Sequence, residues 1–184
     1  MVDPKRVLED YLVASARLGD RSAMAQLVEL RGPRLTAHAA RLLGDVEDAR
    51  DAVQEAWIDI MRGLSRLRDT RAFPAWATRI VTRRCAGLIR KKQKTRAIAE
   101  AVASENEHTT EHCGDASVQS TQIRRAIATL PPEQSATIAL FYLDDMSVAE
   151  VAVATDVPVG TVKTRLMHAR TKLKEALEGG SNEQ

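Results

Sequence analysis

The 184-residue sequence is poor in cysteine, glycine and aromatic residues. Its two cysteines, Cys85 and Cys113, cannot form the disulfide framework of a small secreted domain. His108 and His112 lie near Cys113, but a zinc site would need a fourth ligand and a rigid frame. Solvated linker histidines are the more ordinary interpretation, and Cys85, on the inner face of a predicted helix, is more typical of packing than of redox sensing. The sequence therefore predicts no metal.

The sequence also lacks long apolar runs and the pattern of a signal peptide, which predicts a soluble, cytoplasmic protein. A glycine-rich phosphate loop, a nucleophile motif and a metal-spaced cluster are all missing. An enzyme is therefore the class least expected, with no catalytic residue and no cofactor.

Charge is strongly segregated along the chain, although the net charge is only +2. Residues 45–59 are acidic, residues 62–96 are basic, and residues 100–115 are acidic again. Helix-forming residues dominate, which predicts an all-α protein of two small helical domains. We expect a first domain over 1–96, an acidic flexible linker over 97–122, and a second domain over 123–184.

The first half predicts four helices. One begins near Pro4 and ends near Leu18. The next is capped by Asp20 or Ser22 and ends at Gly44, with a kink or break expected at Gly32–Pro33. A third, from Val46 to about Leu64, has an apolar face opposite an acidic one. The acidic face is an ordinary solvated surface or, since its like charges repel, a binding site for a basic partner.

The fourth predicted helix runs from about Phe73 to Lys94, after a loop at 67–72. Phe73 and Cys85 lie on its inner face, while Arg79, Arg83 and Arg90 project on the other side. Trp76 lies at the boundary, where core packing and stacking on an unpaired base are equally plausible. A basic stripe that carries an aromatic ring suits melted DNA, since cations neutralise phosphates.

The last stretch, 148–177, predicts a helix-turn-helix. Ser147 and Glu150 have capping-box spacing, and Pro158 ends the first helix. The second helix begins near Val159, and it carries no acidic residue from there to Lys174. A plain helical hairpin with a solvated basic face and a DNA-recognition helix both fit this pattern.

Three motifs, in order, resemble the extracytoplasmic-function sigma factors of bacterial RNA polymerase. The first is the acidic stretch at 44–57, GDVEDARDAVQEAW, which resembles the polymerase-binding region. The second is AFPAWATRI at 72–80, which resembles the start of the promoter-melting helix. The third joins LPPEQ at 130–134 with VGTVKTRL at 159–166 and resembles the C-terminal DNA-binding domain.

The resemblance implies a non-catalytic sigma factor that recognises the −35 and −10 promoter elements. Its implied partners are the β′ clamp helices and the β flap of core polymerase, promoter DNA, and an anti-sigma factor. The implied polymerase contacts are Asp48, Asp51, Gln54 and Glu55. The implied contacts with the melted element are Arg68, Arg71, Phe73, Trp76, Arg79, Arg83 and Arg90. The implied contacts with the upstream element are Thr161, Lys163, Thr164, Arg165, His168 and Lys172.

The sequence departs from the family pattern at Arg83, Gly87, Asp156 and His168, which affects the expected base preference more than the role. One alternative is a sigma-like decoy that binds a regulatory protein without binding DNA. The basic residues kept at Lys163, Arg165, Lys172 and Lys174 argue against it. A free-standing repressor would need a dimerisation helix, and the sequence shows no obvious one.

Overall fold

The computed structural model describes residues 4–100 and 126–179, and these residues are helical with short turns between the helices. The N-terminal half holds α1 (Pro4–Arg17), α2 (Arg21–Leu43), α3 (Val46–Gly63), the 3₁₀ turns η1 (Leu64–Arg66) and η2 (Thr70–Ala72), and α4 (Phe73–Glu100). The C-terminal half holds α6 (Pro132–Tyr142), α7 (Val148–Thr155) and α8 (Val159–Gly179). The predicted all-α class is confirmed, and the predicted linker falls mostly outside the described residues.

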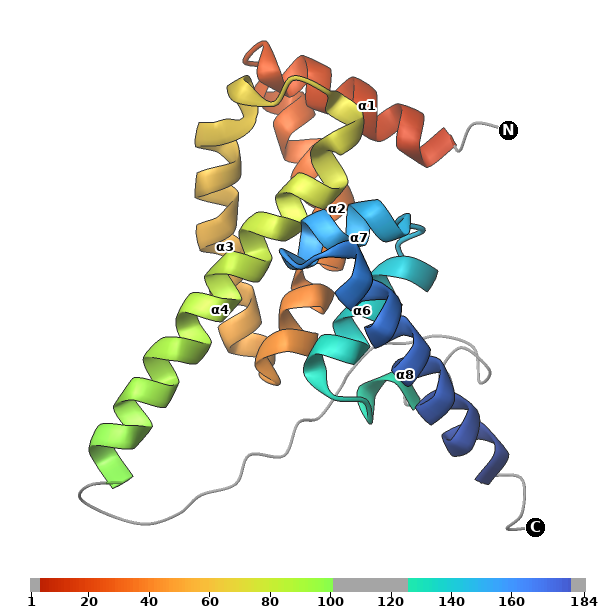
Figure 1. The fold of residues 1–184 in the computed structure, drawn as a ribbon. Helices are drawn as coiled ribbons and strands as arrows, with labels where there is room; N and C mark the ends of the chain where they lie inside the picture. The colour runs from red at the N-terminus through yellow and green to blue at the C-terminus, as the bar shows by residue number, and fades with distance from the viewer. Residues whose placement is uncertain (1–3, 101–125, 180–184) are drawn as a thin grey trace.

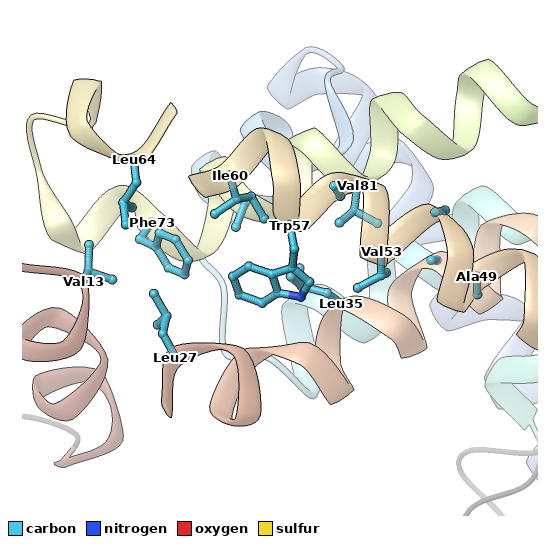
Figure 2. Packing of buried hydrophobic residues seen from close by; sticks show 14 of the residues in the cluster. Val13, Leu27, Leu35, Ala49, Val53, Trp57, Ile60, Leu64, Phe73 and Val81 are labelled. Atoms are coloured by element: carbon cyan, nitrogen blue, oxygen red, sulfur yellow. The ribbon is translucent and has the colours of Figure 1, made fainter. Parts of the chain in front are cut away.

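The N-terminal core forms where α1, α2, α3 and α4 bring their apolar faces together (Figure 2). Trp57 of α3 lies near the centre of this core, with Leu27 and Leu35 of α2 on one side of it. Phe73, the first residue of α4, packs at one end of the same core. Large apolar side chains of this kind each contribute about 1.5–3 kcal/mol when fully buried. The apolar face predicted for α3 is therefore the face that packs.

Local capping signals set the helix boundaries as the sequence predicts. The Asp20 carboxylate accepts hydrogen bonds from the backbone N–H groups of Ser22 and Ala23, and Gly44 ends α2 in the left-handed region at φ 73°. Glycine suits that position because it has no Cβ to clash. Ser147 and Glu150 form the predicted capping box at the start of α7.

Of the kink or break expected at Gly32–Pro33, the break is wrong, because α2 continues through Pro33 without interruption. Proline removes one backbone donor from a helix. Leu27 and Leu35 are nevertheless buried on either side of it, and this packing holds the helix together. Tertiary packing here outweighs the local preference.

The C-terminal core is smaller and joins α6, α7 and α8. Ile138 and Leu140 of α6, Val151 of α7, and Val162 and Leu166 of α8 are buried together. Val159, at the start of α8, is exposed and lies outside this core. The helix-turn-helix geometry follows from this core, which leaves the opposite side of α8 facing outward.

The two halves pack against each other, which the sequence does not predict. In Figure 1, α7 lies against the N-terminal half of α4, and α6 lies beside α2. Ion pairs cross this interface from Arg6 to Glu150, Arg34 to Asp144, and Arg79 to Asp156. The described residues thus form one closed body, with the helix-turn-helix seated on the N-terminal helices.

Candidate polymerase and nucleic-acid interfaces

The acidic face of α3 is divided between solvent and the neighbouring helix α4. Asp51 and Gln54 are exposed, and within residues 4–100 and 126–179 Asp51 has no ion pair. Asp48 pairs with Lys92, and Glu55 pairs with Arg84 at 3.0 Å. Asp59 also pairs with Arg84. The basic helix α4 therefore relieves part of the repulsion on α3, and a partner is not the only source of that relief.

The basic stripe of α4 is also divided. Arg90 is exposed, as the pattern predicts. Arg79 and Arg83, in contrast, both reach the carboxylate of Asp156 in the turn between α7 and α8. Hydrogen bonds from Arg79 and then Arg83 lower the pKa of Asp156. Two of the expected DNA contacts are thus occupied by the protein itself in this conformation.

Phe73 does not fit the set of DNA contacts. Its side chain has no exposed surface and packs in the N-terminal core, so its expected contact with DNA is wrong for this conformation. The structure confirms the prediction that Phe73 lies on the inner face of α4. A fully buried ring at the first position of α4 anchors the helix on the core and has no surface to offer a base.

Trp76 packs at the edge of the same core and is partly buried. Its ring centroid lies 6.1 Å from that of Phe73. A Cβ atom added to Gly63 would come within 3.0 Å of the Trp76 ring, so the glycine at the end of α3 makes room for it. Of the two interpretations of Trp76, this conformation shows packing.

Arg68 and Arg71 lie on the segment that connects α3 to α4, and both are exposed. Asp69 caps the short η2 turn and accepts a hydrogen bond from the Arg71 side chain at 3.2 Å. This hydrogen bond lowers the pKa of Asp69. Both arginines therefore project from the end of the bundle where α4 begins, while Arg90 lies farther along that helix.

On α8, the predicted outer face is exposed at four of its six positions. Lys163, Thr164, His168 and Lys172 face solvent. Arg165 is only 19% exposed and pairs with Glu133 of α6, and Thr161 is half-buried. Arg165 lies on the flank of α8 that faces α6. Fewer cations of α8 are therefore free to bind DNA than the sequence predicts.

Two residues that the sequence patterns do not predict as contacts lie where the halves meet. The sequence marks Asp156 only as a departure from the family pattern, and it gives no signal for Thr82. Thr82 Oγ1 lies 2.7 Å from the Ala154 carbonyl of α7 and 2.9 Å from Nε2 of the buried His38. Burial lowers the pKa of His38 to about 3, so this imidazole is neutral near pH 7. No periodicity in the sequence marks these contacts, because Thr82, His38 and Asp156 are isolated polar residues that belong to no repeating pattern.

Cys85 is fully buried, and burial raises the pKa of its thiol to about 12, which agrees with its predicted packing role. Cys113, His108 and His112 lie outside the described residues. Among residues 4–100 and 126–179, no group of histidine, cysteine and carboxylate side chains is arranged to hold a metal ion. No helix in that same part of the chain is long and apolar enough to cross a membrane.

Comparison with known families agrees with this division into two helical modules. Residues 27–95 match the family model for Sigma-70 region 2, and residues 120–173 match the one for Sigma-70 region 4. The fold and its exposed faces thus define two modules of a bacterial RNA polymerase sigma factor.

Similar whole proteins narrow the assignment. The ECF RNA polymerase sigma factor SigW of Bacillus subtilis is 30% identical over 177 residues, which cover 90% of this chain and 94% of SigW. SigM of Mycobacterium tuberculosis is 34% identical, with 90% of this chain and 83% of SigM covered. The chain belongs to the extracytoplasmic-function sigma factors, and as such it directs promoter-specific transcription by RNA polymerase.

A solved structure shares the fold. The sigma factor RpoE of Bartonella quintana, in complex with the anti-sigma factor NepR, superposes with a TM-score of 0.65 at 23% identity. The match covers 84% of this chain and 96% of RpoE.

Proposed function

We propose that this sigma factor divides its work among three surfaces. The exposed acidic face of α3, centred on Asp51, binds the β′ clamp helices of core polymerase, with Asp48, Gln54 and Glu55 beside it. The basic stripe of α4 and the preceding turn hold the melted −10 strand. The outer face of α8 enters the major groove of the −35 element. The polypeptide is a non-catalytic subunit and acts in the cytoplasm.

The proposed division of the chain follows the same surfaces. Residues 1–96 carry polymerase binding and promoter melting, residues 97–122 connect the two modules, and residues 123–184 carry upstream recognition. The connector would pass the polymerase active centre and RNA exit path, and the second module would reach the β flap.

The observation that carries the proposal is the arrangement of charge on exposed helix faces. Lys163, His168 and Lys172 are all exposed on α8, outside the apolar stripe by which that helix packs in the core. A decoy that never binds DNA has no use for such a surface, so this arrangement favours DNA recognition. The proposed contacts with the melted strand are five arginines of α4 and the turn before it: Arg68, Arg71, Arg79, Arg83 and Arg90. Phe73 is left out because it is buried.

An anti-sigma partner is part of the proposal. Its support is the Bartonella quintana relative of the same fold, which was solved with the anti-sigma factor NepR. Such a partner would cover the polymerase-binding and DNA-binding faces together.

Run-off transcription with core polymerase on a promoter library tests the role, and a charge reversal tests the polymerase surface. Asp51→Lys should reduce affinity for core polymerase by at least tenfold and leave the unfolding temperature unchanged, because Asp51 is exposed and has no ion pair in the described residues. Glu29→Lys is the matched control, since Glu29 is an exposed acid on α2. Equal affinity of the two variants would refute the α3 assignment. A wild-type chain that initiates at no promoter would refute the role.

A further inference from the structure

The turn of the helix-turn-helix is held to the promoter-melting helix by one carboxylate. Asp156 Oδ1 accepts hydrogen bonds from Nε and Nη2 of Arg79 at 3.0 and 2.7 Å, and Oδ2 accepts one from Nε of Arg83 at 3.1 Å. Asp156 has a left-handed backbone, with φ at 56°. A residue with a side chain is uncommon there. The turn thus places a carboxylate at a position where glycine would be relaxed.

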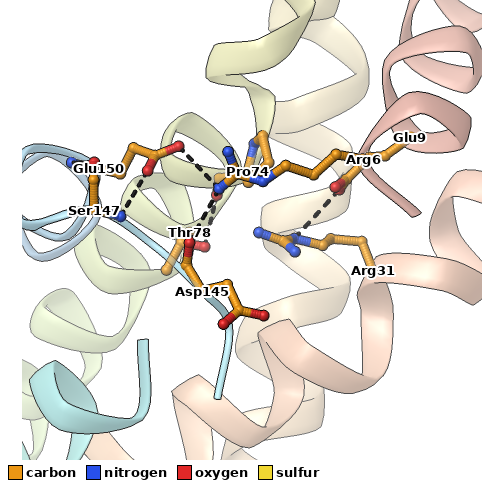
Figure 3. Close-up of polar contacts among 8 residues, drawn as sticks. All are labelled: Arg6, Glu9, Arg31, Pro74, Thr78, Asp145, Ser147 and Glu150. Atoms are coloured by element: carbon orange, nitrogen blue, oxygen red, sulfur yellow. Dashed lines mark hydrogen bonds and ion pairs between the residues drawn. The ribbon is translucent and has the colours of Figure 1, made fainter. Parts of the chain in front are cut away.

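Further polar contacts seat the same module on the N-terminal helices. The Thr82 hydroxyl of α4 donates to the Ala154 carbonyl at 2.7 Å, next to the turn. Nε2–H of His38 can in turn donate to Thr82, so the contact runs from α2 through α4 to α7. Figure 3 shows Arg6 of α1 reaching across to the Asp145 carbonyl at 3.2 Å and to Glu150 at 3.3 Å.

A carboxylate and a phosphate compete for the same arginine donors. Guanidinium groups bind both anions through charge-assisted hydrogen bonds, so each donor that Asp156 occupies is unavailable to a phosphate. Helix α7 also packs on α4, and Thr82, which lies between these arginines in the sequence, contacts Ala154 of α7. We propose that Asp156 is an autoinhibitory latch that keeps the free sigma factor closed, its carboxylate standing in for a phosphate of the melted promoter strand.

The latch rests on the proposed role of Arg79 and Arg83 in DNA binding. Its ion pairs are exposed enough to be broken when DNA binds. Arg83 keeps 62% of its side chain exposed, and Asp156 keeps 39%. Exposed ion pairs are individually weak, so they are easily exchanged for others. Arg90 and Arg71 face solvent outside the latch, where an incoming strand can begin to bind. DNA then displaces Asp156 from Arg83 and Arg79, and the module swings away.

The test uses the whole chain, free of polymerase. Asp156→Asn removes the charge and keeps a side chain that tolerates the left-handed region. Asp145→Asn is its matched control, because Asp145 is also exposed with φ at 52°, and only its backbone carbonyl contacts Arg6. Arg6→Gln is a second opening variant. It removes a positive charge, so any gain in DNA binding that it causes cannot come from simple electrostatics.

Two measurements are made on each variant. Spin labels at Gln93→Cys on α4 and Thr171→Cys on α8, in a Cys113→Ser background, report the distance between the halves. Titration with a short mixed-sequence single-stranded DNA reports access to the arginines. We expect Asp156→Asn to raise the population of long distances and the DNA affinity about fivefold, the scale of two exposed ion pairs. Arg6→Gln should shift both in the same direction, and Asp145→Asn should resemble the wild type.

Equal distance distributions and DNA affinities for Asp156→Asn and Asp145→Asn would overturn the latch. So would a loss of DNA affinity in Arg6→Gln without any longer distance. Failure of the proposed role has a different signature. In that case the wild-type chain directs no run-off transcript with core polymerase, whatever the distances show. If the distances lengthen in Asp156→Asn while its DNA affinity stays at the level of the control, Asp156 closes the chain but does not mask the arginines, which also overturns the proposal.

Discussion

At the scale of single residues, His38 is the group most sensitive to its surroundings. It is fully buried between α2 and α4, and within the described residues its Nδ1 atom has no hydrogen-bond partner. Desolvation lowers its pKa from 6.5 to about 3, and nearby Arg41 adds to the shift. A neutral imidazole with Nε2–H toward Thr82 fits this site. A charged one would have to be desolvated.

The folding stability should therefore fall in mild acid. The pKa of His38 is lower in the folded chain than in the unfolded chain, so the unfolded state binds an extra proton below pH 6.5. Stability present above pH 6.5 is lost as the pH falls toward 3, at about 1.4 kcal/mol per pH unit, or about 2 kcal/mol at pH 5. Urea unfolding at pH 7 and pH 5 measures this loss.

The control for this prediction is His38→Gln, which does not titrate. Its stability should decline less between pH 7 and pH 5, by about the same 2 kcal/mol. Parallel declines of the two proteins would show that other groups cause the acid sensitivity.

At the scale of elements, α8 separates the residues that hold it from those that face outward. Val162, Leu166 and Ala169 pack in the C-terminal core, and Arg165 is held by Glu133. Lys163 and Lys172 are exposed, outside this buried stripe. The helix can thus lose an outward charge without losing its place in the fold.

Lys163→Ala should weaken binding of upstream promoter duplex by several-fold at low salt and leave the unfolding temperature unchanged. If the lysine neutralises one phosphate, the slope of log affinity against log salt should decrease by about one. Arg21→Ala is the matched control, because Arg21 is an exposed cation at the start of α2. Indistinguishable salt slopes for the two variants would remove Lys163 from the interface.

At the scale of the whole molecule, ion pairs join the N-terminal and C-terminal halves in addition to their packed helices. The Arg6, Arg34 and Arg79 side chains are each about 40% exposed or slightly more, and each pairs with an acid of the C-terminal half. Screening acts strongly on such exposed pairs, because the Debye length falls from about 10 Å at 0.1 M salt to about 3 Å at 1 M. The balance between closed and open forms should therefore depend on ionic strength.

Small-angle scattering of the free chain should show a larger radius of gyration at 1 M sodium chloride than at 0.05 M. Asp156→Asn should start larger and change less, since part of the screened attraction is already missing. A wild-type radius that does not change with salt would show that apolar contacts alone keep the halves together.

The fold could be predicted from the sequence wherever the signal was local. The Asp20 cap, the Gly44 end and the Ser147–Glu150 box each lie within a few residues of the helix they define. Apolar periodicity correctly located the inner faces of α3 and α4. These features are local in sequence, so one chain is enough to show them.

The arrangement of the site could not be predicted in the same way. Arg79 and Asp156 are 77 residues apart, and Arg165 and Glu133 are 32 apart. A helical wheel shows a charged residue as outward-facing, even when another element of the same chain covers it. Phe73 is the reverse case, because a motif placed it among the DNA contacts while packing places it in the core.

The buried thiol of Cys85 can report how often the N-terminal core opens. With a pKa of about 12 and no accessible surface, the sulfhydryl stays protonated and shielded while α4 rests on the N-terminal core. Alkylating reagents and oxidants attack the thiolate, so they reach this position only during excursions that lift α4 away. The rate at which Cys85 is modified therefore measures how often α4 separates from the N-terminal core.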